Sequence, residues 1–355
     1  RQKHAAQAAR NEHLVVQLAL QLLLTGLKKD ALNARSPEGL ALLDPLLPLL
    51  VQALPSRHQG VVSVAVKAFC HLVKLPLAGL PRAAPDAGHE VYRIMQGSMR
   101  AASAICQECF QLVAGLLRSC KVYKPPDGQL KFLVGFAFSD LEDTTTRTTT
   151  FTLLKAIVHR GLMLPEVYDL MTRVAELIVR SQILPVRQMC SQVFLQFMLD
   201  YPLGDKRLQQ HLNALLANLE FEYEEGRASC LEMVNAVVVK FPTPVLDKQS
   251  ELFFLPLVTR LVNDPSPKCR AMVGAVIKNL LQHVTPARAD RLYKFAESWY
   301  QGGDPRLRRA AAQTLGLVAD AEEARFEKRL GGLVGPLLES LSRRADEIED
   351  EGEDE

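Results

Sequence analysis

Residues 263–281 read NDPSPKCRAMVGAVIKNLL: a short polar turn, then an arginine, then an apolar run. After Arg270, apolar side chains from Met272 to Leu281 recur at the three- and four-residue spacing of one helix face. The prolines stand before this run, where a first helical turn tolerates them. The stretch therefore predicts the turn and the second helix of a helical hairpin.

The same pattern recurs along the chain, at residues 140–158, 181–198, 222–238 and 302–318. The aligned arginines are Arg147, Arg187, Arg227, Arg270 and Arg308, separated by 40, 40, 43 and 38 residues. Weaker copies begin near Gly60 and at Arg100. HEAT and armadillo repeats have periods of about 40–47 residues, and one hairpin cannot bury its apolar face without neighbours. The sequence predicts an all-α fold, an α-solenoid of HEAT/armadillo-type hairpins with about fourteen helices.

Length and charge set the domain organisation. The 355 residues are too many for one compact core of ordinary size. Residues 346–355 read DEIEDEGEDE, and without them 42 basic residues stand against 32 acidic ones. We expect a basic helical array over residues 1–345 and an acidic, disordered tail or linker over 346–355. Because the chain begins with Arg1 and a charged stretch, we interpret it as a segment of a longer solenoid.

Two stretches interrupt the helical pattern. Residues 74–89, KLPLAGLPRAAPDAGH, are rich in Pro, Ala and Gly and predict a flexible loop between repeats. Residues 121–129, KVYKPPDGQ, predict a second loop. Prolines at 45, 76, 125, 165, 202, 242, 286 and 305 predict the joints between helices.

Signatures of catalysis are missing from the sequence. Cys106 and Cys109 have the spacing of a redox or zinc pair, but no second pair lies nearby, and we interpret them as core residues. No phosphate-binding loop, dinucleotide fingerprint or nucleophile elbow occurs. Seven scattered cysteines favour a reducing compartment. The longest apolar run, residues 13–27, is too short for a membrane span. We expect no enzyme activity, cofactor, metal or membrane association.

The aligned arginines have a structural interpretation. In HEAT stacks such an arginine pairs with an aspartate of the preceding turn or of the next repeat, and Asp143 with Arg147 and Asp264 with Arg270 fit that pattern. Trp299, the one tryptophan, is interpreted as a packing anchor.

Basic residues beyond the repeat pattern are the candidate ligand contacts. Clustered Lys and Arg can neutralise phosphates independently of nucleotide sequence, whereas ordinary solvated helix ends are the alternative interpretation. Few aromatic residues accompany the clusters, so a base-stacking platform is not indicated. The candidate RNA or phosphate contacts are Lys206, Arg207, Arg288, Arg291, Arg306, Arg308, Arg309, Lys328, Arg329, Arg343 and Arg344, and Lys28 and Lys29 form a further basic pair.

Several stretches resemble one particular HEAT family. They are LLKAIV (153–158), VRQMCSQVFLQFMLDYPLGDKRL (186–208), LEFEYEEGRASCLEM (219–233), ELFFLPLVTRLVNDPSPKCRAMV (251–273) and RFEKRLG (325–331). The chain thereby resembles the family of small-subunit processome component twenty, also known as the down-regulated-in-metastasis (DRIM) family. The resemblance covers most of residues 125–335 and is most specific between Val186 and Met233.

That resemblance implies a nucleolar scaffold without catalytic activity. The family belongs to the small-subunit processome, the 90S pre-ribosome, which forms on pre-ribosomal RNA with the U3 small nucleolar RNA and releases 18S ribosomal RNA. The implied partners are pre-ribosomal RNA or U3 RNA and other processome proteins. A karyopherin-like transport receptor and a signalling scaffold that binds only protein are the alternatives. The basic body argues against the first, because transport receptors usually carry acidic inner surfaces.

Overall fold

The computed structural model describes residues 2–97, 103–139, 141, 147–302 and 304–342. Within these ranges the chain forms seventeen α-helices and two 3-10 helices joined by short turns, and no strand. The all-α prediction is confirmed. The predicted number of helices, about fourteen, was too low, partly because residues 37–53 form two short helices that break at Asp44 and Pro45.

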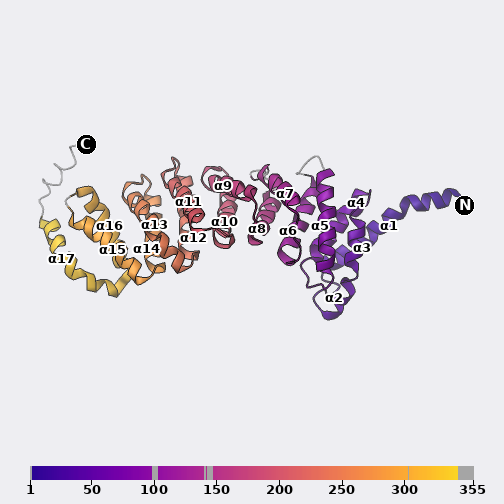
Figure 1. Cartoon of the computed structure of the whole chain (residues 1–355), viewed down its shortest axis with the longest axis horizontal. Coiled ribbons are helices and arrows are strands. Elements are labelled where there is room, and N and C mark those ends of the chain that lie inside the picture. Colours follow the sequence, from indigo (N-terminus) through magenta and orange to yellow (C-terminus); the bar gives the residue numbers. More distant parts are fainter. Residues whose placement is uncertain (1, 98–102, 140, 142–146, 303, 343–355) are drawn as a thin grey trace. The chain divides into compact units, whose positions relative to one another are not determined.

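The helices are named in chain order in Figure 1. The first nine are α1 (Gln2–Lys28), α2 (Pro37–Leu43), α3 (Leu46–Ala53), α4 (Gln59–Leu72), α5 (Leu80–Gly97), α6 (Ala104–Ser119), α7 (Asp127–Ser139), α8 (Arg147–His159) and α9 (Pro165–Arg180). The remainder are α10 (Leu184–Asp200), α11 (Asp205–Ala217), η1 (Asn218–Glu220), α12 (Glu224–Lys240), α13 (Thr243–Asn263), α14 (Pro267–His283), α15 (Pro286–Gln301), α16 (Pro305–Glu322), η2 (Glu323–Phe326) and α17 (Glu327–Ser342).

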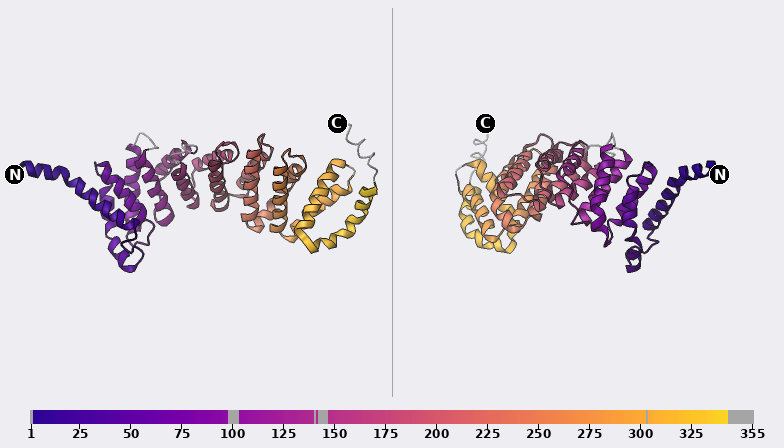
Figure 2. Two further views of the ribbon diagram at one scale, coloured as in Figure 1. Left: turned by 180° about the vertical axis from the view of Figure 1, so that it is seen from behind. Right: turned by 45° about the vertical axis from the view of Figure 1, so that its right-hand side comes forward.

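The chain divides into two compact units. The first extends to Val174 and also holds Gln192–Pro202, and the second holds Ala175–Ser191 and continues from Leu203. In the first unit α1, α4, α6 and α8 stack in that order, with α3 against α4, α5 against α6 and α7 against α8. In the second unit α12, α14 and α16 stack in the same way, with α11, α13 and α15 beside them (Figure 2). Repeated hairpins stacked along one direction are an α-solenoid, as predicted.

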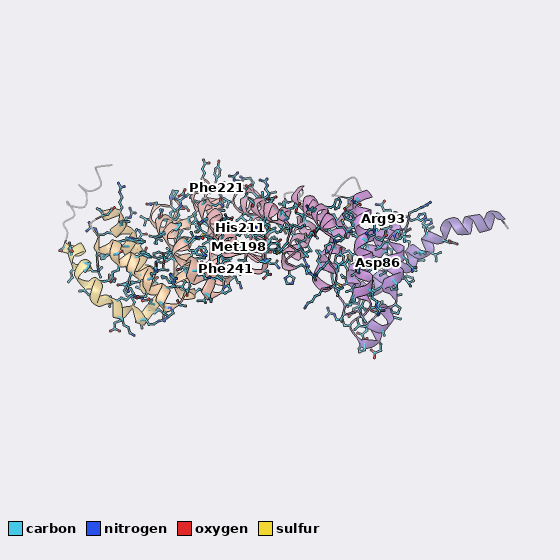
Figure 3. All side chains as sticks on the ribbon, viewed as in Figure 1. Asp86, Arg93, Met198, His211, Phe221 and Phe241 are labelled. Atoms are coloured by element: carbon cyan, nitrogen blue, oxygen red, sulfur yellow. The ribbon has the colours of Figure 1, made fainter. Side chains whose placement is uncertain are left out.

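The predicted apolar stripes form the cores of the units. In α10 the side chains of Cys190, Val193, Phe194, Phe197 and Met198 are all buried, as the spacing after Arg187 requires. In α14 the predicted stripe begins at Met272, which is half-exposed, and its other members, from Val273 to Leu281, are buried. Phe221 and Phe241, labelled in Figure 3, flank α12 at its two ends. Helix register could therefore be read from the sequence.

Three of the five aligned arginines share one local geometry. Arg187, Arg227 and Arg270 each donate a hydrogen bond to the carbonyl oxygen six residues earlier, over 2.8, 2.9 and 2.6 Å. That carbonyl belongs to the turn before the second helix of the hairpin. The arginine therefore fastens each turn to the helix that follows it, and this task explains its recurrence once per repeat.

Arg227 also joins neighbouring repeats through a buried ion pair. Its Nε and NH2 donate to both carboxylate oxygens of Asp264 over 2.9 and 3.0 Å, and the Asp264 carboxylate accepts the backbone N–H of Ser266 as well. The predicted pair of Asp264 with Arg270 was wrong in its details. Arg270 donates to the Asp264 backbone carbonyl, because the carboxylate already faces Arg227 of the preceding repeat. The predicted Asp143–Arg147 pair, the copy at Arg100 and the acidic tail lie outside the described side chains.

The predicted loop over residues 74–89 was also wrong, because α5 begins at Leu80. Pro81 occupies the first turn, where its missing N–H leaves no bond unmade. Ala84 and Ala87 are fully buried, so the small side chains that suggest a loop are what allows close helix packing here. The second predicted loop is correct from Lys121 to Pro126, and α7 begins at Asp127. All eight prolines predicted to mark joints lie between helices or within the first turn of one.

Candidate nucleic-acid interface

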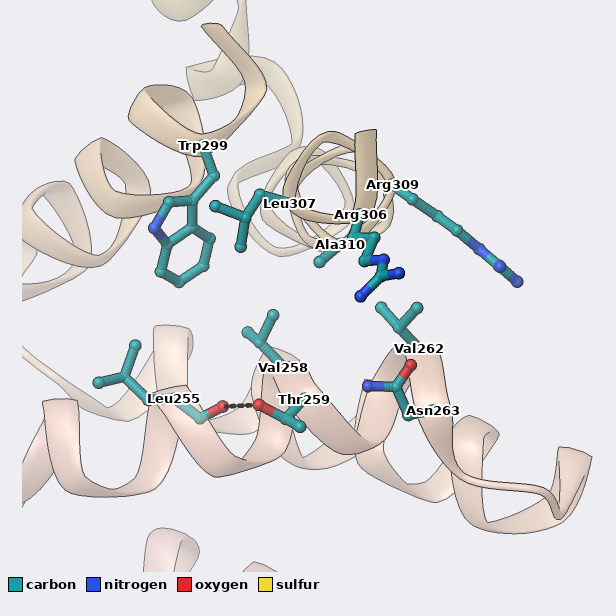
Figure 4. Close-up of a pocket in the computed structure, with 10 residues that line it drawn as sticks. All are labelled: Leu255, Val258, Thr259, Val262, Asn263, Trp299, Arg306, Leu307, Arg309 and Ala310. Carbon is teal, nitrogen blue, oxygen red and sulfur yellow. Dashed lines mark hydrogen bonds between the residues drawn. The ribbon is translucent and has the colours of Figure 1, made fainter. Parts of the chain in front are cut away.

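A groove in the second unit contains two of the predicted phosphate contacts. It measures about 580 Å³ and lies between one face of α13 and the start of α16, with Trp299 of α15 at one end (Figure 4). The α13 side is Leu255, Val258, Thr259, Val262 and Asn263, and the α16 side is Arg306, Leu307, Arg309 and Ala310. Its charged lining residues are both arginines. The groove therefore joins an apolar floor to a cationic rim.

The electrostatic setting of this rim is unusual for cations. Arg306, Arg308 and Arg309 lie in the first two turns of α16, after the N-cap residue Asp304, whose carboxylate accepts the Arg306 N–H over 2.8 Å. The positive end of the helix dipole disfavours cations at this position. The alternative interpretation, in which basic residues suit helix ends, applies to C-termini and does not explain this cluster. Added to the dipole, the guanidinium groups make this end of α16 a favourable place for an anion.

Trp299 has both a packing role and an exposed face. Its ring stacks with Phe254 and with Phe295, with 6.2 Å between ring centroids in each pair. The ring is nevertheless half-exposed and lines the groove with Leu255 and Leu307. The packing interpretation agrees with these contacts. One aromatic ring is no stacking platform, so this surface offers charge and shape rather than base recognition.

The structure sorts the other candidates by what surrounds them. Lys206 and Arg207 are exposed in the first turn of α11 and are not among the residues that line the groove. Arg288 and Arg291 of α15 both approach Glu251, with N–O distances of 3.4 and 2.7 Å to the same oxygen. One carboxylate thus offsets part of the charge of this second pair.

Arg329 is engaged within the chain. Its guanidinium donates to both Glu322 oxygens over 2.6 Å and to Asp290 over 2.8 Å, and it lies 4.0 Å from the centre of the Tyr293 ring. These hydrogen bonds raise the pKa of Arg329 and lower the pKa of Asp290. Lys328 is exposed and lines a pocket together with Asp290, Glu322 and Arg329. Arg329 therefore fastens α17 to α15, and we leave it out of the proposed phosphate surface.

Arg343 and Arg344 lie outside the described residues. Cys106 and Cys109 are both buried in α6, and burial raises the pKa of the Cys109 thiol. That environment fits the predicted core role. Across the described ranges, no group of His, Cys, Asp and Glu is arranged to hold a metal ion, and no helix has the length and apolarity to cross a membrane.

Sequence reasoning missed a set of cations in the first unit. Arg118 of α6 and Lys155 of α8 are 37 positions apart in the chain, yet Arg118 acts electrostatically on Lys155. Lys74 follows α4 and Lys121 follows α6, and these two helices stack next to each other. The predicted clusters contain only residues that lie close together in sequence. The available signal was the repeat period, which brings basic residues about one repeat apart onto neighbouring helices.

Two known proteins are similar to the chain in sequence. The chain is 27% identical over 263 residues to the U3 small nucleolar RNA-associated protein 20 of Saccharomyces cerevisiae, and 25% identical over 292 residues to the protein of that name from Schizosaccharomyces pombe. The chain resembles U3 small nucleolar RNA-associated protein 20. The alignments cover 74% and 82% of this chain but only 10% and 11% of the U3-associated proteins, so it spans about a tenth of their length. The family resemblance drawn from the sequence is confirmed, although no protein-family model matches the chain.

Solved structures agree on the fold. A mutant of Kap121p matches with a TM-score of 0.53 and 12% identity, over 91% of this chain and 38% of the Kap121p chain. The karyopherin Kap121p bound to the SUMO protease Ulp1p matches with a TM-score of 0.51 and 13% identity, over 91% and 39%. At such identities the likeness establishes a shared helical-repeat architecture and nothing about function.

Proposed function

We propose that this chain is a segment of a scaffold in the small-subunit processome, the 90S pre-ribosome. In this role it has no catalytic activity and supports pre-ribosomal RNA processing and 18S ribosomal RNA maturation in the nucleolus. The similarity to the U3 small nucleolar RNA-associated proteins supports the setting. The solenoid supports the mode of action, because stacked repeats offer long surfaces on which RNA and processome proteins can be held.

One observation carries the proposed RNA contact: three arginines concentrate at the positive end of α16, beside a groove whose charged residues are both cationic. Arg309 is exposed and forms no ion pair with the residues that the structure describes. A cation at the positive end of a helix dipole is electrostatically unfavourable, and binding of an anion there lowers that energy. RNA phosphates are anions of the required chemistry and are bound without regard to sequence.

The test is RNA binding by the purified chain. Fluorescence anisotropy with labelled U3 small nucleolar RNA is recorded between 50 and 300 mM salt, with transfer RNA as competitor. Binding that persists under competition and weakens steeply with salt supports a direct grip on RNA. Absence of binding at the lowest salt contradicts the proposed RNA contact and leaves a scaffold that holds proteins.

The α16 cluster has its own prediction. The triple variant Arg306→Ala, Arg308→Ala, Arg309→Ala is expected to bind RNA about tenfold or more weakly at 0.1 M salt, and to lose up to about 2 units of the salt slope, since each phosphate contact on a single strand contributes about 0.7. Anisotropy across the salt series measures both quantities.

The matched control removes three charges elsewhere in the second unit, as Arg180→Ala, Lys240→Ala, Lys268→Ala. All three side chains are exposed, and none has an ion pair among the described residues. Long-range attraction falls equally in both variants, so only a local contact separates them. If the two variants bind alike, the α16 cluster is not part of the interface.

A further inference from the structure

The first unit carries a row of cations along one edge of its stack. The row consists of Lys28 in the last turn of α1, Lys74 just after α4, Arg118 at the end of α6, Lys121 just after α6, and Lys155 in α8. Arg118 and Lys121 both lie at the end of α6, and the other steps are of 46, 44 and 34 residues, about one repeat, so the row passes from α1 to α4, α6 and α8, which stack in that order. Stacked helices lie about 8–10 Å apart, which gives the row a length of about 30 Å.

Contacts at each junction bring the row together. Lys28 and Lys74 both act on the imidazole of His71, whose pKa is lowered by burial and by these two ammonium groups. Between α4 and α6, Gly115 lies so close to Val73 that a Cβ there would come within 2.7 Å of the valine side chain. Lys74 follows Val73, and Arg118 lies one turn after Gly115. The C-terminal ends of these helices therefore share one edge.

The last junction places two cations together. Arg118 donates to the Thr152 carbonyl over 2.9 Å, one turn before Lys155, and Lys155 donates to the Gln192 side-chain oxygen over 2.6 Å. Burial and the charge of Arg118 lower the pKa of Lys155. Both hydrogen-bond acceptors are neutral oxygens, so neither offsets the repulsion between the two cations.

The five cations of the row form no ion pair with a carboxylate in the part of the chain that the structure describes. Cations at other helix junctions of the first unit do have one: Lys67 pairs with Glu108 over 2.9 Å, and Lys131 pairs with Glu166 over 2.9 Å. Other cations of the first unit, such as Arg35 and Arg57, also lack an ion pair within the described ranges, so what distinguishes this edge is that its unpaired cations lie close to one another.

The general preference of cations for helix C-termini explains only part of this row. Arg160, just after α8, donates to the carbonyls of Cys120, Lys121 and Tyr123, and so satisfies the backbone that follows α6. The Lys121 side chain has no such task, and Lys155 contacts a side chain rather than a helix end. Like charges held close raise the free energy of the empty surface, and a bound polyanion lowers it.

We propose that Lys28, Lys74, Arg118, Lys121 and Lys155 form a binding site for the phosphate backbone of an RNA strand. The proposal rests on the proposed function, since it assumes that the chain meets RNA, and it adds a second contact surface in a different unit from α16. Polar and cationic side chains at a regular step along a strand fit a backbone rather than base edges.

The experiment compares two variants of the whole chain for binding to a labelled 20-nucleotide oligouridylate. The row variant is Lys74→Gln, Arg118→Gln, Lys155→Gln. The control is Arg35→Gln, Arg57→Gln, Arg82→Gln, which removes three exposed charges of the same unit that also have no ion pair. We expect the row variant to bind about tenfold or more weakly than the control at 0.1 M salt, with a salt slope smaller by about 2.

If the row variant and the control bind oligouridylate equally, the proposed binding site is wrong. If the unchanged chain still binds oligouridylate in that case, the proposed function is not contradicted. Failure of the unchanged chain to bind at low salt overturns both. Binding of oligoglutamate of equal charge, lost in the row variant while oligouridylate binding is kept, would assign the edge to an acidic peptide and also overturn the proposal. Unchanged circular dichroism and melting temperature exclude misfolding of the row variant.

Footprinting gives a second measurement that needs no variant. Lysines of the unchanged chain are acetylated briefly with and without oligouridylate, and modification is quantified by mass spectrometry. We expect RNA to protect Lys74, Lys121 and Lys155 severalfold, and to leave Lys131 and Lys248 unprotected because they lie off the row and pair with carboxylates. Equal protection of all five lysines, or none, contradicts the proposed site.

Discussion

Replacement of Asp264 by Ala is expected to lower the free energy of unfolding of the second unit by about 3–5 kcal/mol. The side chain of Asp264 is 1% exposed and that of Arg227 is 6% exposed, so the guanidinium would remain buried without its counter-ion. The substitution also removes the acceptor for the Ser266 N–H at the start of α14. Urea unfolding followed by the fluorescence of Trp299, which lies in the same unit, measures the change.

The matched control is Asp320→Ala. Asp320 also pairs with a cation of a neighbouring helix, Lys278, over 3.3 Å, but its side chain is 63% exposed. An exposed pair contributes about 0–1 kcal/mol, so the control should unfold nearly as the unchanged chain does. A loss below about 1 kcal/mol for Asp264→Ala would mean that water or another anion compensates Arg227. The ion pair would then not be what fastens one repeat to the next.

The fold could be predicted because its repeated contacts are local in sequence. Arg187, Arg227 and Arg270 each reach back six residues to close a turn. A contact of this kind requires an arginine at a fixed position of the repeat, and the apolar stripe that follows the arginine sets the register of the helix. Spacing alone does not show whether the Asp264 carboxylate pairs with Arg227 of the preceding repeat or with Arg270 of its own repeat. The sequence therefore predicted the wrong arginine as its partner.

The loop prediction at residues 74–89 failed for a physical reason. Proline and alanine are typical of a break, but in α5 Pro81 stands in the first turn, which accepts it, and the alanines lie at a close helix contact, while Pro85 stands inside the helix. Ala84 and Ala87 show no exposed surface, and that tertiary packing outweighs the local signal. Sequence composition records the residue types and not what packs against them.

The candidate site was predicted in part. The three α16 arginines are close together in sequence, so they were predicted as a cluster, and two of them, Arg306 and Arg309, line the groove. Arg329 was predicted as a contact in the same way, because Glu322 of α16 and Asp290 of α15, the carboxylates that hold it, become its neighbours only when α17 packs against these helices. Lys155 was omitted because the nearby cation, Arg118, belongs to the preceding repeat. Charge clusters in a solenoid have to be sought at the repeat period as well as along the chain.

Phe194→Ala is the second substitution with a large expected effect, about 3–5 kcal/mol of unfolding free energy lost from the first unit. Phe194 is fully buried in α10, and its ring lies 6.3 Å from that of Phe197 at an angle of 28°. The substitution removes most of a side chain that has no exposed surface, and the surrounding structure relaxes only partly into the cavity left behind. Urea unfolding followed by far-ultraviolet circular dichroism measures the loss.

Two controls on this region separate cavity formation from loss of helix propensity. Leu199→Ala, on the same helix and 39% exposed, replaces a larger side chain with alanine without opening a core cavity and should change stability by well under 1 kcal/mol. Phe194→Leu keeps most of the volume and should lose about half as much as the alanine variant. In a linear stack each repeat contacts only its neighbours, so the loss should appear in the unfolding of the first unit while Trp299 reports an unchanged second unit. If Trp299 fluorescence shifted equally in Phe194→Ala, the two units would unfold as one.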